Sequence, residues 1–148
     1  MDDILDLYQE VILDHGRHPR CYGQIEPVQF TIQGHNPLCG DQIQIYLSKQ
    51  NNRIVQLQFT GSGCAISKAS ASLLCMRLAN LDVDEAMAIL RDFQAMVKGE
   101  CAGSDRLKKL AVMSGVQAFP SRVKCATLAS HAISSILAGD QKTVTTET

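Results

Sequence analysis

The sequence predicts an α+β domain, a three-stranded antiparallel sheet packed against several helices, because strand-like segments come first and helical segments follow. Three segments in the first half alternate apolar and polar residues, which is typical of strands with one buried face. The second half shows helical spacing throughout, so a parallel sheet that alternates strands with helices is excluded. The 148 residues suit one domain. We expect it to span residues 1–140, before a disordered polar tail over 141–148.

The individual elements follow from the same patterning. Residues 2–15 place apolar side chains at helical spacing, and this amphipathic helix should end near Gly16. A polar run at 48–53 fits a hairpin turn. Asp82 and Asp84 are alternative caps for the helix that follows them. The expected strands are residues 28–33, 42–47 and 54–59, and the expected helices of the second half are 64–79, 83–97, 105–113 and 124–137.

Composition excludes several functional classes. A formal net charge of −1, no tryptophan and only 5% aromatic residues argue against a nucleic-acid-binding surface. The longest uncharged stretch, residues 55–67, contains many polar residues, so no membrane span is expected. The acidic N-terminal residues do not resemble a signal peptide. We therefore expect a cytoplasmic protein that binds neither nucleic acid nor membrane.

Six cysteines are the unusual feature of the composition. In a reducing cytosol disulfides are rare, and thiols serve as core residues, metal ligands or reactive groups. Cys39, Cys64 and Cys125 each lie near glycine or proline at the edge of an element, which makes a core role a poor explanation for the set. The other three, for which we expect a core or isolated position, are Cys21, Cys75 and Cys101.

The predicted hairpin brings three ligand-type side chains to one end of the sheet. If the turn is centred between Gln50 and Asn51, Cys39 lies opposite Ser62 and Asp41 lies opposite Thr60. Cys39 and Asp41 are two residues apart in an extended segment, so their side chains project to the same side. Cys64 lies just beyond Ser62. We therefore expect Cys39, Asp41 and Cys64 to converge.

Helix starts favour the thiolate form of two of these cysteines. Cys64 follows Gly63 and opens a helix, and Cys125 is expected in the first turn of another helix. Backbone N–H groups and the positive end of the helix dipole stabilise a thiolate there. Lys124 and Arg122 add positive charge beside Cys125. Three thiolates and one carboxylate would form a tetrahedral Zn²⁺ site, in which the carboxylate is the weaker and more exchangeable ligand.

Other interpretations of these residues stay open. Asp41 follows a glycine and has equal claim to be a turn cap. His35 lies near Cys39 and is a candidate ligand, although a surface or capping histidine is the commoner case. Spacing alone therefore indicates a thiolate metal site and leaves its purpose undefined.

Three segments carry a recognisable pattern. They read Asn-Pro-Leu-Cys-Gly-Asp at 36–41, Gly-Ser-Gly-Cys-Ala-Ile-Ser at 61–67 and Phe-Pro-Ser-Arg-Val-Lys-Cys-Ala-Thr-Leu at 119–128. The sequence at 8–15, with His-Pro-Arg at 18–20, has the pattern of an opening helix. In all of these segments the chain resembles the IscU/SufU (NifU N-terminal-like) iron–sulfur cluster assembly family.

Within that family the chain resembles the SufU subtype. Lys124 stands immediately before the last cysteine, where IscU-type scaffolds carry a histidine. The long separation of Cys64 and Cys125 fits the longer SufU version. The Leu-Pro-Pro-Val-Lys motif by which a chaperone recognises IscU is missing from the sequence.

The resemblance implies a metal site formed by Cys39, Asp41, Cys64 and Cys125. In a SufU-type protein Cys39 would accept persulfide sulfur, after a group of the desulfurase has displaced it from Zn²⁺. Arg122 would stabilise the negative charge of the site, or would be an ordinary solvated arginine. The chemistry is sulfur transfer by thiolate attack.

The resemblance also implies partners and an alternative function. The partners would be a SufS-like cysteine desulfurase and apo iron–sulfur proteins or other cluster assembly components. Whether the chain is itself an enzyme, a sulfurtransferase acting with the desulfurase, is left open. The alternative is a scaffold on which a [2Fe-2S] cluster is assembled and passed on, so the cofactor is Zn²⁺ or an iron–sulfur cluster. A third hypothesis is a binding module in which zinc is purely structural.

Overall fold

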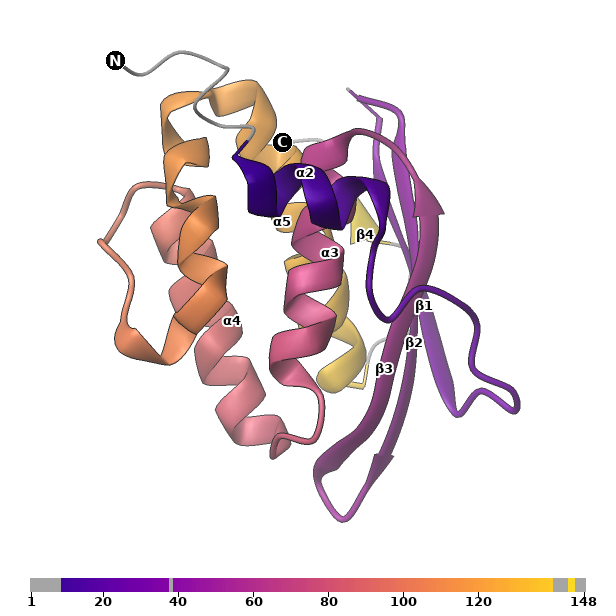
Figure 1. Ribbon diagram of the computed structural model, residues 1–148. Helices are drawn as coiled ribbons and strands as arrows, with labels where there is room; N and C mark the ends of the chain where they lie inside the picture. Colours follow the sequence, from indigo (N-terminus) through magenta and orange to yellow (C-terminus); the bar gives the residue numbers. More distant parts are fainter. Residues whose placement is uncertain (1–8, 38, 140–143, 146–148) are drawn as a thin grey trace.

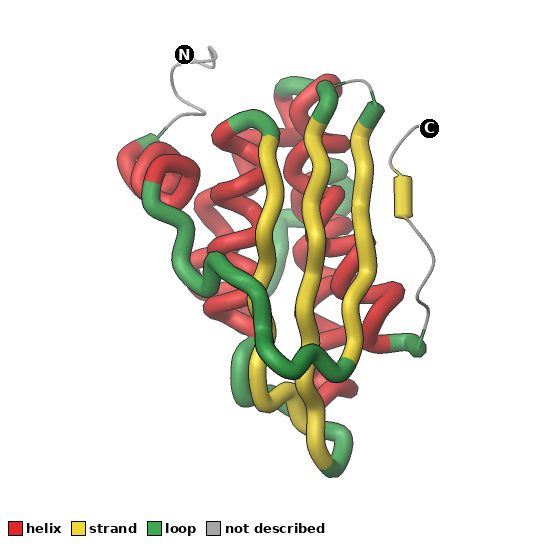
Figure 2. Tube along the Cα trace, turned by 90° about the vertical axis from the view of Figure 1, so that its right-hand side faces the viewer, coloured by secondary structure: helices red, strands yellow, loops and turns green. Residues whose placement is uncertain are grey.

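The computed structural model describes residues 9–37, 39–139 and 144–145, and it confirms the predicted α+β fold with a three-stranded antiparallel sheet. Helices cover one face of the sheet, and the connection over residues 18–29, which leads into the first strand, crosses the opposite face (Figures 1 and 2). None of the helices in the described part of the chain is long and apolar enough to cross a membrane.

The elements follow the predicted order along the chain. Helix α4 has the predicted bounds, and Asp82 is its N-cap, accepting a hydrogen bond from the N–H of Asp84. The 3₁₀ helix η1 is longer than expected. The elements are α2 (Glu10–Arg17), β1 (Phe30–Asn36), β2 (Asp41–Gln50), β3 (Arg53–Ser62), α3 (Ala65–Leu78), α4 (Val83–Val97), η1 (Asp105–Ala118), α5 (Pro120–Leu137) and β4 (Val144–Thr145).

Both ends of the chain extend beyond the described residues. The predicted N-terminal helix over 2–15 is seen as α2, and its first part, residues 2–8, lies outside the described residues. Of the predicted tail over 141–148, only Val144–Thr145 is described. This strand, β4, pairs in parallel with Gly34 and His35 of β1, which gives the sheet order β3-β2-β1-β4.

The hairpin between β2 and β3 differs in register from the prediction. Gln50 pairs with Arg53, so the turn is centred between Asn51 and Asn52, one residue later than expected. Both asparagines have positive φ, 54° and 61°. Asparagine tolerates this conformation and is favoured in two-residue hairpin turns, whose twist matches that of the strands. A β-bulge at Ser48 shifts the pairing once more.

The shifted register makes two predicted cross-strand pairs wrong. Ser62 pairs with Gln42 and not with Cys39. Thr60 pairs with Gln44 and not with Asp41. Both differences have the same cause, because the turn residues and the bulge move β3 along β2.

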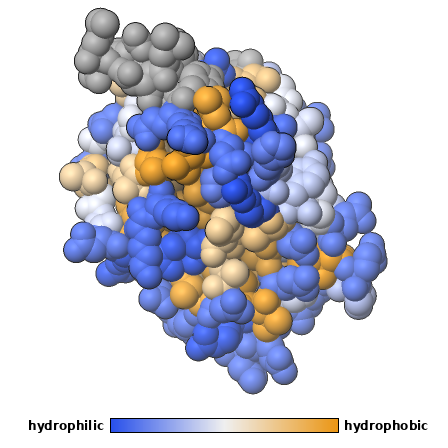
Figure 3. All heavy atoms as spheres, in the orientation of Figure 1, coloured by the Kyte–Doolittle hydropathy of each residue, from blue (hydrophilic) through white to orange (hydrophobic). Residues whose placement is uncertain are grey.

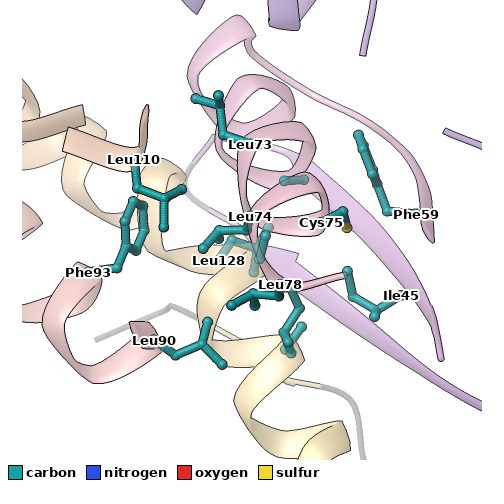
Figure 4. Close-up of a cluster of buried hydrophobic side chains, with 14 of the residues drawn as sticks. Ile45, Phe59, Leu73, Leu74, Cys75, Leu78, Leu90, Phe93, Leu110 and Leu128 are labelled. Atoms are coloured by element: carbon teal, nitrogen blue, oxygen red, sulfur yellow. The ribbon is translucent and has the colours of Figure 1, made fainter. Parts of the chain in front are cut away.

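Helix α3 forms the centre of the core. It packs between the sheet and the remaining helices, and its fully buried residues include Leu74 and Cys75. Figure 4 shows Leu74 among the apolar side chains of the helical layer, whereas Cys75 points toward Phe59 and Ile45 of the sheet. Hydrophilic side chains cover most of the outer helical surface, with apolar patches between them (Figure 3). The first turn of α3 therefore belongs to a helix whose central residues are packed in the core.

Replacing Leu74 by alanine tests the central position of α3. Leu74 is fully buried, so Leu74→Ala should lower the free energy of unfolding by about 2–5 kcal/mol through lost apolar burial and a cavity. Urea denaturation followed by circular dichroism measures it. Met76→Ala, on the same helix at a side chain that is 44% exposed, should change stability by about 0.5 kcal/mol or less. Equal effects of both changes would contradict this packing.

A buried histidine makes the stability dependent on pH. Ser72 Oγ accepts the N–H of Arg20 and lies 2.7 Å from Nδ1 of His15. Burial, and then the charge of Arg20, lowers the pKa of His15. The unfolded chain therefore takes up a proton more readily than the folded chain, so His15 contributes full stability above about pH 6.5 and destabilises as the pH falls toward its lowered pKa.

The variant His15→Gln should accordingly lose less stability than the native chain between about pH 7 and pH 5. Urea midpoints across this range provide the measurement. His18→Gln, at an exposed histidine one residue beyond α2, serves as the control and should follow the native curve. If His15→Gln lost as much stability as the native chain over this pH range, the role of His15 in the pH dependence would be rejected.

Candidate metal centre

Four secondary-structure boundaries place ligand-type side chains at one end of the sheet. The turn between β1 and β2 carries Cys39, and Asp41 is the first residue of β2. Cys64 is the N-cap of α3, which agrees with its predicted position at the start of a helix. The β1–β2 turn, the β3–α3 connection and the start of α5 all lie at this end (Figures 1 and 2).

Cys125 reaches the same place from a different position than expected. Helix α5 begins at Pro120, four residues earlier than predicted, with proline in its first turn. The predicted first-turn position of Cys125 is therefore wrong, because this residue lies in the second turn. Proline is pre-organised for the first helical position, so the helix starts at the proline and not after it.

Three ligand atoms form a tight cluster. One sulfur or carboxylate oxygen each from Cys39, Asp41 and Cys125 lies within 4.8 Å of the others. The sulfur atoms of Cys39 and Cys125 are 3.2 Å apart. Cys39 is exposed, whereas Asp41 and Cys125 are fully buried. The cluster thus presents one sulfur to solvent and keeps the other two ligands inside.

Cys64 joins this cluster through Asp41. The N–H of Cys64 donates to Oδ1 of Asp41 at 2.9 Å, and the Cys64 sulfur lies 3.8 Å from Oδ2. The capping interpretation and the ligand interpretation of Asp41 are therefore compatible. One carboxylate oxygen holds the start of α3, and the carboxylate still lies in the cluster.

The environment distinguishes the thiols. A hydrogen bond shared with Cys125, together with the N–H of Ser67, 3.5 Å from the sulfur, lowers the pKa of Cys64 to about 7. The same hydrogen bond favours the protonated form of Cys125 and, with burial, raises its pKa. Cys64 is consequently the more acidic thiol of the pair.

The remaining cysteines lie apart from the cluster. Cys75 is buried in α3, where burial raises its pKa strongly, and burial also raises the pKa of the half-buried Cys21. Cys101 is exposed in the connection between α4 and η1. His35 lies in β1 opposite Gln42 and does not belong to the ligand cluster found among the described residues.

Two residues of the site escaped the sequence analysis. Asn36 is fully buried, and its side-chain amide donates to the sulfur of Cys125. Gly63 has φ +149°, and a Cβ atom there would collide with the carboxylate of Asp41. The glycine could have been found from its place directly before Cys64. The burial of Asn36 has no signal in the local pattern, since asparagine at a strand end is usually exposed.

The donor set fits Zn²⁺. Thiolates and a carboxylate are ligands that zinc accepts, and the cluster offers three such donors, from Cys39, Asp41 and Cys125, with the sulfur of Cys64 beside Asp41. Thiolate sulfur also binds iron in iron–sulfur clusters. The role of Arg122, in the first turn of α5, stays a prediction.

The fold and the site together define a class of protein, a small α+β domain with a cysteine-rich cluster of candidate metal ligands at one end of its sheet. A sequence profile of the NifU-like N-terminal domain family matches residues 7–126. The chain belongs to this IscU/SufU family of iron–sulfur cluster assembly proteins.

Individual relatives fall on both sides of the IscU and SufU division. The chain is 36% identical over 128 residues to the iron–sulfur cluster assembly scaffold protein IscU of Streptococcus pyogenes. The aligned region covers 86% of this chain and 80% of that protein. The chain is 34% identical over 128 residues to the zinc-dependent sulfurtransferase SufU of Bacillus subtilis, covering 86% of each.

A solved structure has the same fold. The chain superposes with a TM-score of 0.84 and 27% identity on a crystal structure described as a putative scaffold protein for the SUF system from Fervidobacterium islandicum. The match covers 88% of this chain and 96% of that one. The likeness therefore extends over nearly the whole domain.

Substituting Gly63 tests the packing around Asp41. In Gly63→Ala the new Cβ would displace the carboxylate of Asp41, so we expect zinc affinity to fall about 10–100-fold, as for changes that misorient a ligand. Competition with a chromophoric chelator measures the affinity. Gly115→Ala is the matched control, because a Cβ there has nothing within 4 Å, and it should bind zinc as the native chain does. Unchanged affinity in Gly63→Ala would contradict the arrangement.

Proposed function

We propose that this chain is a SufU-type iron–sulfur cluster assembly protein that accepts persulfide sulfur from a cysteine desulfurase on Cys39. The observation that carries the proposal is the exposed sulfur of Cys39, 3.2 Å from the buried sulfur of Cys125. Sulfur transfer requires access for the partner's persulfide, and among the three cysteines of the site Cys39 is the exposed one.

The transfer balances without any added oxidant or reductant. The Cys39 thiolate attacks the terminal sulfur of the persulfide on the desulfurase, and a new S–S bond forms at Cys39. The bond between that sulfur and the desulfurase cysteine breaks, which leaves a thiolate on the desulfurase. The sulfane sulfur thus moves from one cysteine to another with no net change in oxidation state.

The site residues have different tasks in this proposal. Cys39, Asp41, Cys64 and Cys125 would hold Zn²⁺, which supplies Lewis acidity that keeps bound thiols deprotonated. The half-buried Cys64 and the buried Cys125 would remain as ligands while Cys39 reacts. Arg122 would offset the negative charge of the ligands from the first turn of α5.

Several observations support zinc and sulfur transfer over cluster assembly. Lys124 precedes Cys125, in the position that distinguishes the SufU pattern from the IscU pattern. A relative at 34% identity is named a zinc-dependent sulfurtransferase. The proposed partners are accordingly a SufS-like desulfurase and, downstream, cluster assembly components or apo proteins, in the cytoplasm.

A cluster scaffold is the second candidate, favoured by the carboxylate of Asp41 and by the names of other relatives. A carboxylate is the weakest ligand of the set, which would ease release of a [2Fe-2S] cluster as cargo. Anaerobic reconstitution should then give a coloured protein that transfers its cluster to an apo acceptor. A colourless zinc-loaded protein that donates no cluster would exclude this function.

Cysteine desulfurase turnover provides the main test. The native chain should stimulate turnover in the presence of Zn²⁺, and Cys39→Ala should abolish the stimulation because the acceptor sulfur is lost. Mass spectrometry should find the additional sulfur on the peptide that contains Cys39. Cys101→Ala is the matched control, since Cys101 is also exposed but lies outside the cluster, and it should stimulate fully. Equal stimulation by native chain and Cys39→Ala would reject the acceptor role.

Chelation separates this function from a purely structural zinc site. A structural site contributes much of the folding energy, so removing the metal should unfold a binding module of that kind. The sulfur-acceptor proposal expects a folded protein after chelation, because most residues of the buried core lie outside the site. Circular dichroism before and after chelation distinguishes the two.

A further inference from the structure

Asn36 contacts three of the segments that form the metal centre. It is the last residue of β1 and is fully buried. Its backbone carbonyl accepts the N–H groups of Gly40, at 2.9 Å, and Cys39, at 3.3 Å, which fixes the turn that carries Cys39. It pairs across the sheet with Asp41. Its side-chain nitrogen Nδ2 donates to the sulfur of Cys125 at 3.7 Å.

The three sulfur atoms of the site differ in the N–H groups that they accept. Cys125 accepts the side-chain amide of Asn36, and Cys64 accepts the backbone N–H of Ser67. Within the described part of the chain, the hydrogen bond to the sulfur of Cys39 comes from the thiol of Cys125 and not from an N–H group. Two sulfurs are therefore held by N–H donors, and the exposed one is not.

This difference bears on which sulfur reacts. An N–H group that donates to a thiolate orients the sulfur, withdraws electron density from it and stabilises it as a ligand. The effect is stronger in a buried site, where water does not compete. Such a sulfur is a poorer nucleophile than one without that donor.

We propose that Asn36 is a positioning residue that retains Cys125 as a metal ligand and thereby leaves Cys39 as the sulfur that reacts. This inference rests on the proposed function and adds a residue to it. The backbone of Asn36 holds the reactive turn, and its side chain holds the retained ligand. One buried residue thus separates the roles of two sulfurs that lie 3.2 Å apart.

Two substitutions at Asn36 separate hydrogen bonding from shape. Asn36→Asp keeps the shape but replaces the N–H donors by an oxygen that faces the sulfur, whereas Asn36→Leu keeps roughly the volume and removes all polarity. If the donor matters, zinc affinity falls about tenfold in Asn36→Leu and further in Asn36→Asp. If only shape matters, Asn36→Asp stays close to the native chain. Gln33→Leu, at an exposed amide on the same strand, is the control and should not change the affinity.

Spectroscopy gives a readout that a purely structural role would not change. In the Co²⁺-substituted protein, loss of the N–H donor makes the Cys125 thiolate a stronger electron donor, so the sulfur-to-metal charge-transfer band should move to longer wavelength in Asn36→Leu. In the native chain loaded with the NMR-active cadmium isotope, the side-chain amide protons of Asn36 should show coupling to the metal through the sulfur. This second measurement needs no variant to fold.

The outcomes distinguish this inference from the proposed function. An unshifted charge-transfer band in Asn36→Leu, an absent coupling in the native chain, or native affinity in Asn36→Asp would each overturn the role of Asn36. Those results would leave sulfur acceptance by Cys39 intact. Conversely, failure of Cys39→Ala to reduce desulfurase stimulation would reject the proposed function, while a shifted band would still assign the hydrogen bond from Asn36 to Cys125.

Discussion

The buried carboxylate of Asp41 is the group on which the rest of the site depends. It lies at the first residue of β2 and is fully shielded from solvent, where a carboxylate without hydrogen bonds would be costly. The N–H of Cys64 satisfies one of its oxygens and joins the end of the sheet to the start of α3. The close approach requires a residue without Cβ at position 63, and glycine also tolerates the φ of +149° found there. The carboxylate that lies in the ligand cluster therefore also holds Cys64, the N-cap residue of α3.

The fold divides the ligands into a fixed group and an accessible one. Cys64 and Cys125 belong to α3 and α5, two helices that pack against each other within the core. Cys39 lies instead on the turn between β1 and β2, at the surface. Ligands held by packed helices keep their positions when another ligand dissociates from the metal. A residue in a surface turn can move at a lower cost in free energy. This division would be the physical basis of the proposed function, in which one sulfur reacts while the others hold the metal.

Much of the fold was predictable from the sequence because periodicity reports burial directly. Helix α4 illustrates this, since its apolar spacing and its capping aspartate fix both of its ends. The strand register was not predictable in the same way. It depends on which two residues of a polar run adopt positive φ, here Asn51 and Asn52, and on a bulge that leaves no mark in the apolar pattern.

The candidate site was predictable in part for a related reason. The structure groups Cys39 and Asp41 with Cys125, and Cys64 contacts Asp41. These contacts form although the predicted register was wrong, because Cys39, Asp41 and Cys64 lie at ends of elements that meet at one end of the sheet. The second-turn position of Cys125 follows from Pro120, a local helix-start signal that the predicted helix overlooked, whereas the burial of Asn36 depends on tertiary packing. No local pattern encodes that packing.

The hydrogen bonding of Asp41 also bears on the choice between sulfur transfer and cluster assembly. A scaffold that releases its cargo benefits from a carboxylate ligand that exchanges easily. In this chain Oδ1 of Asp41 is already bound to the N–H of Cys64, so displacing the carboxylate would also weaken the start of α3. Cys39 carries no such structural duty through its sulfur, and it is exposed. Under the proposed function, release of the Cys39 sulfur would leave the contact between Asp41 and Cys64 in place, which is consistent with a protein that accepts sulfur at Cys39.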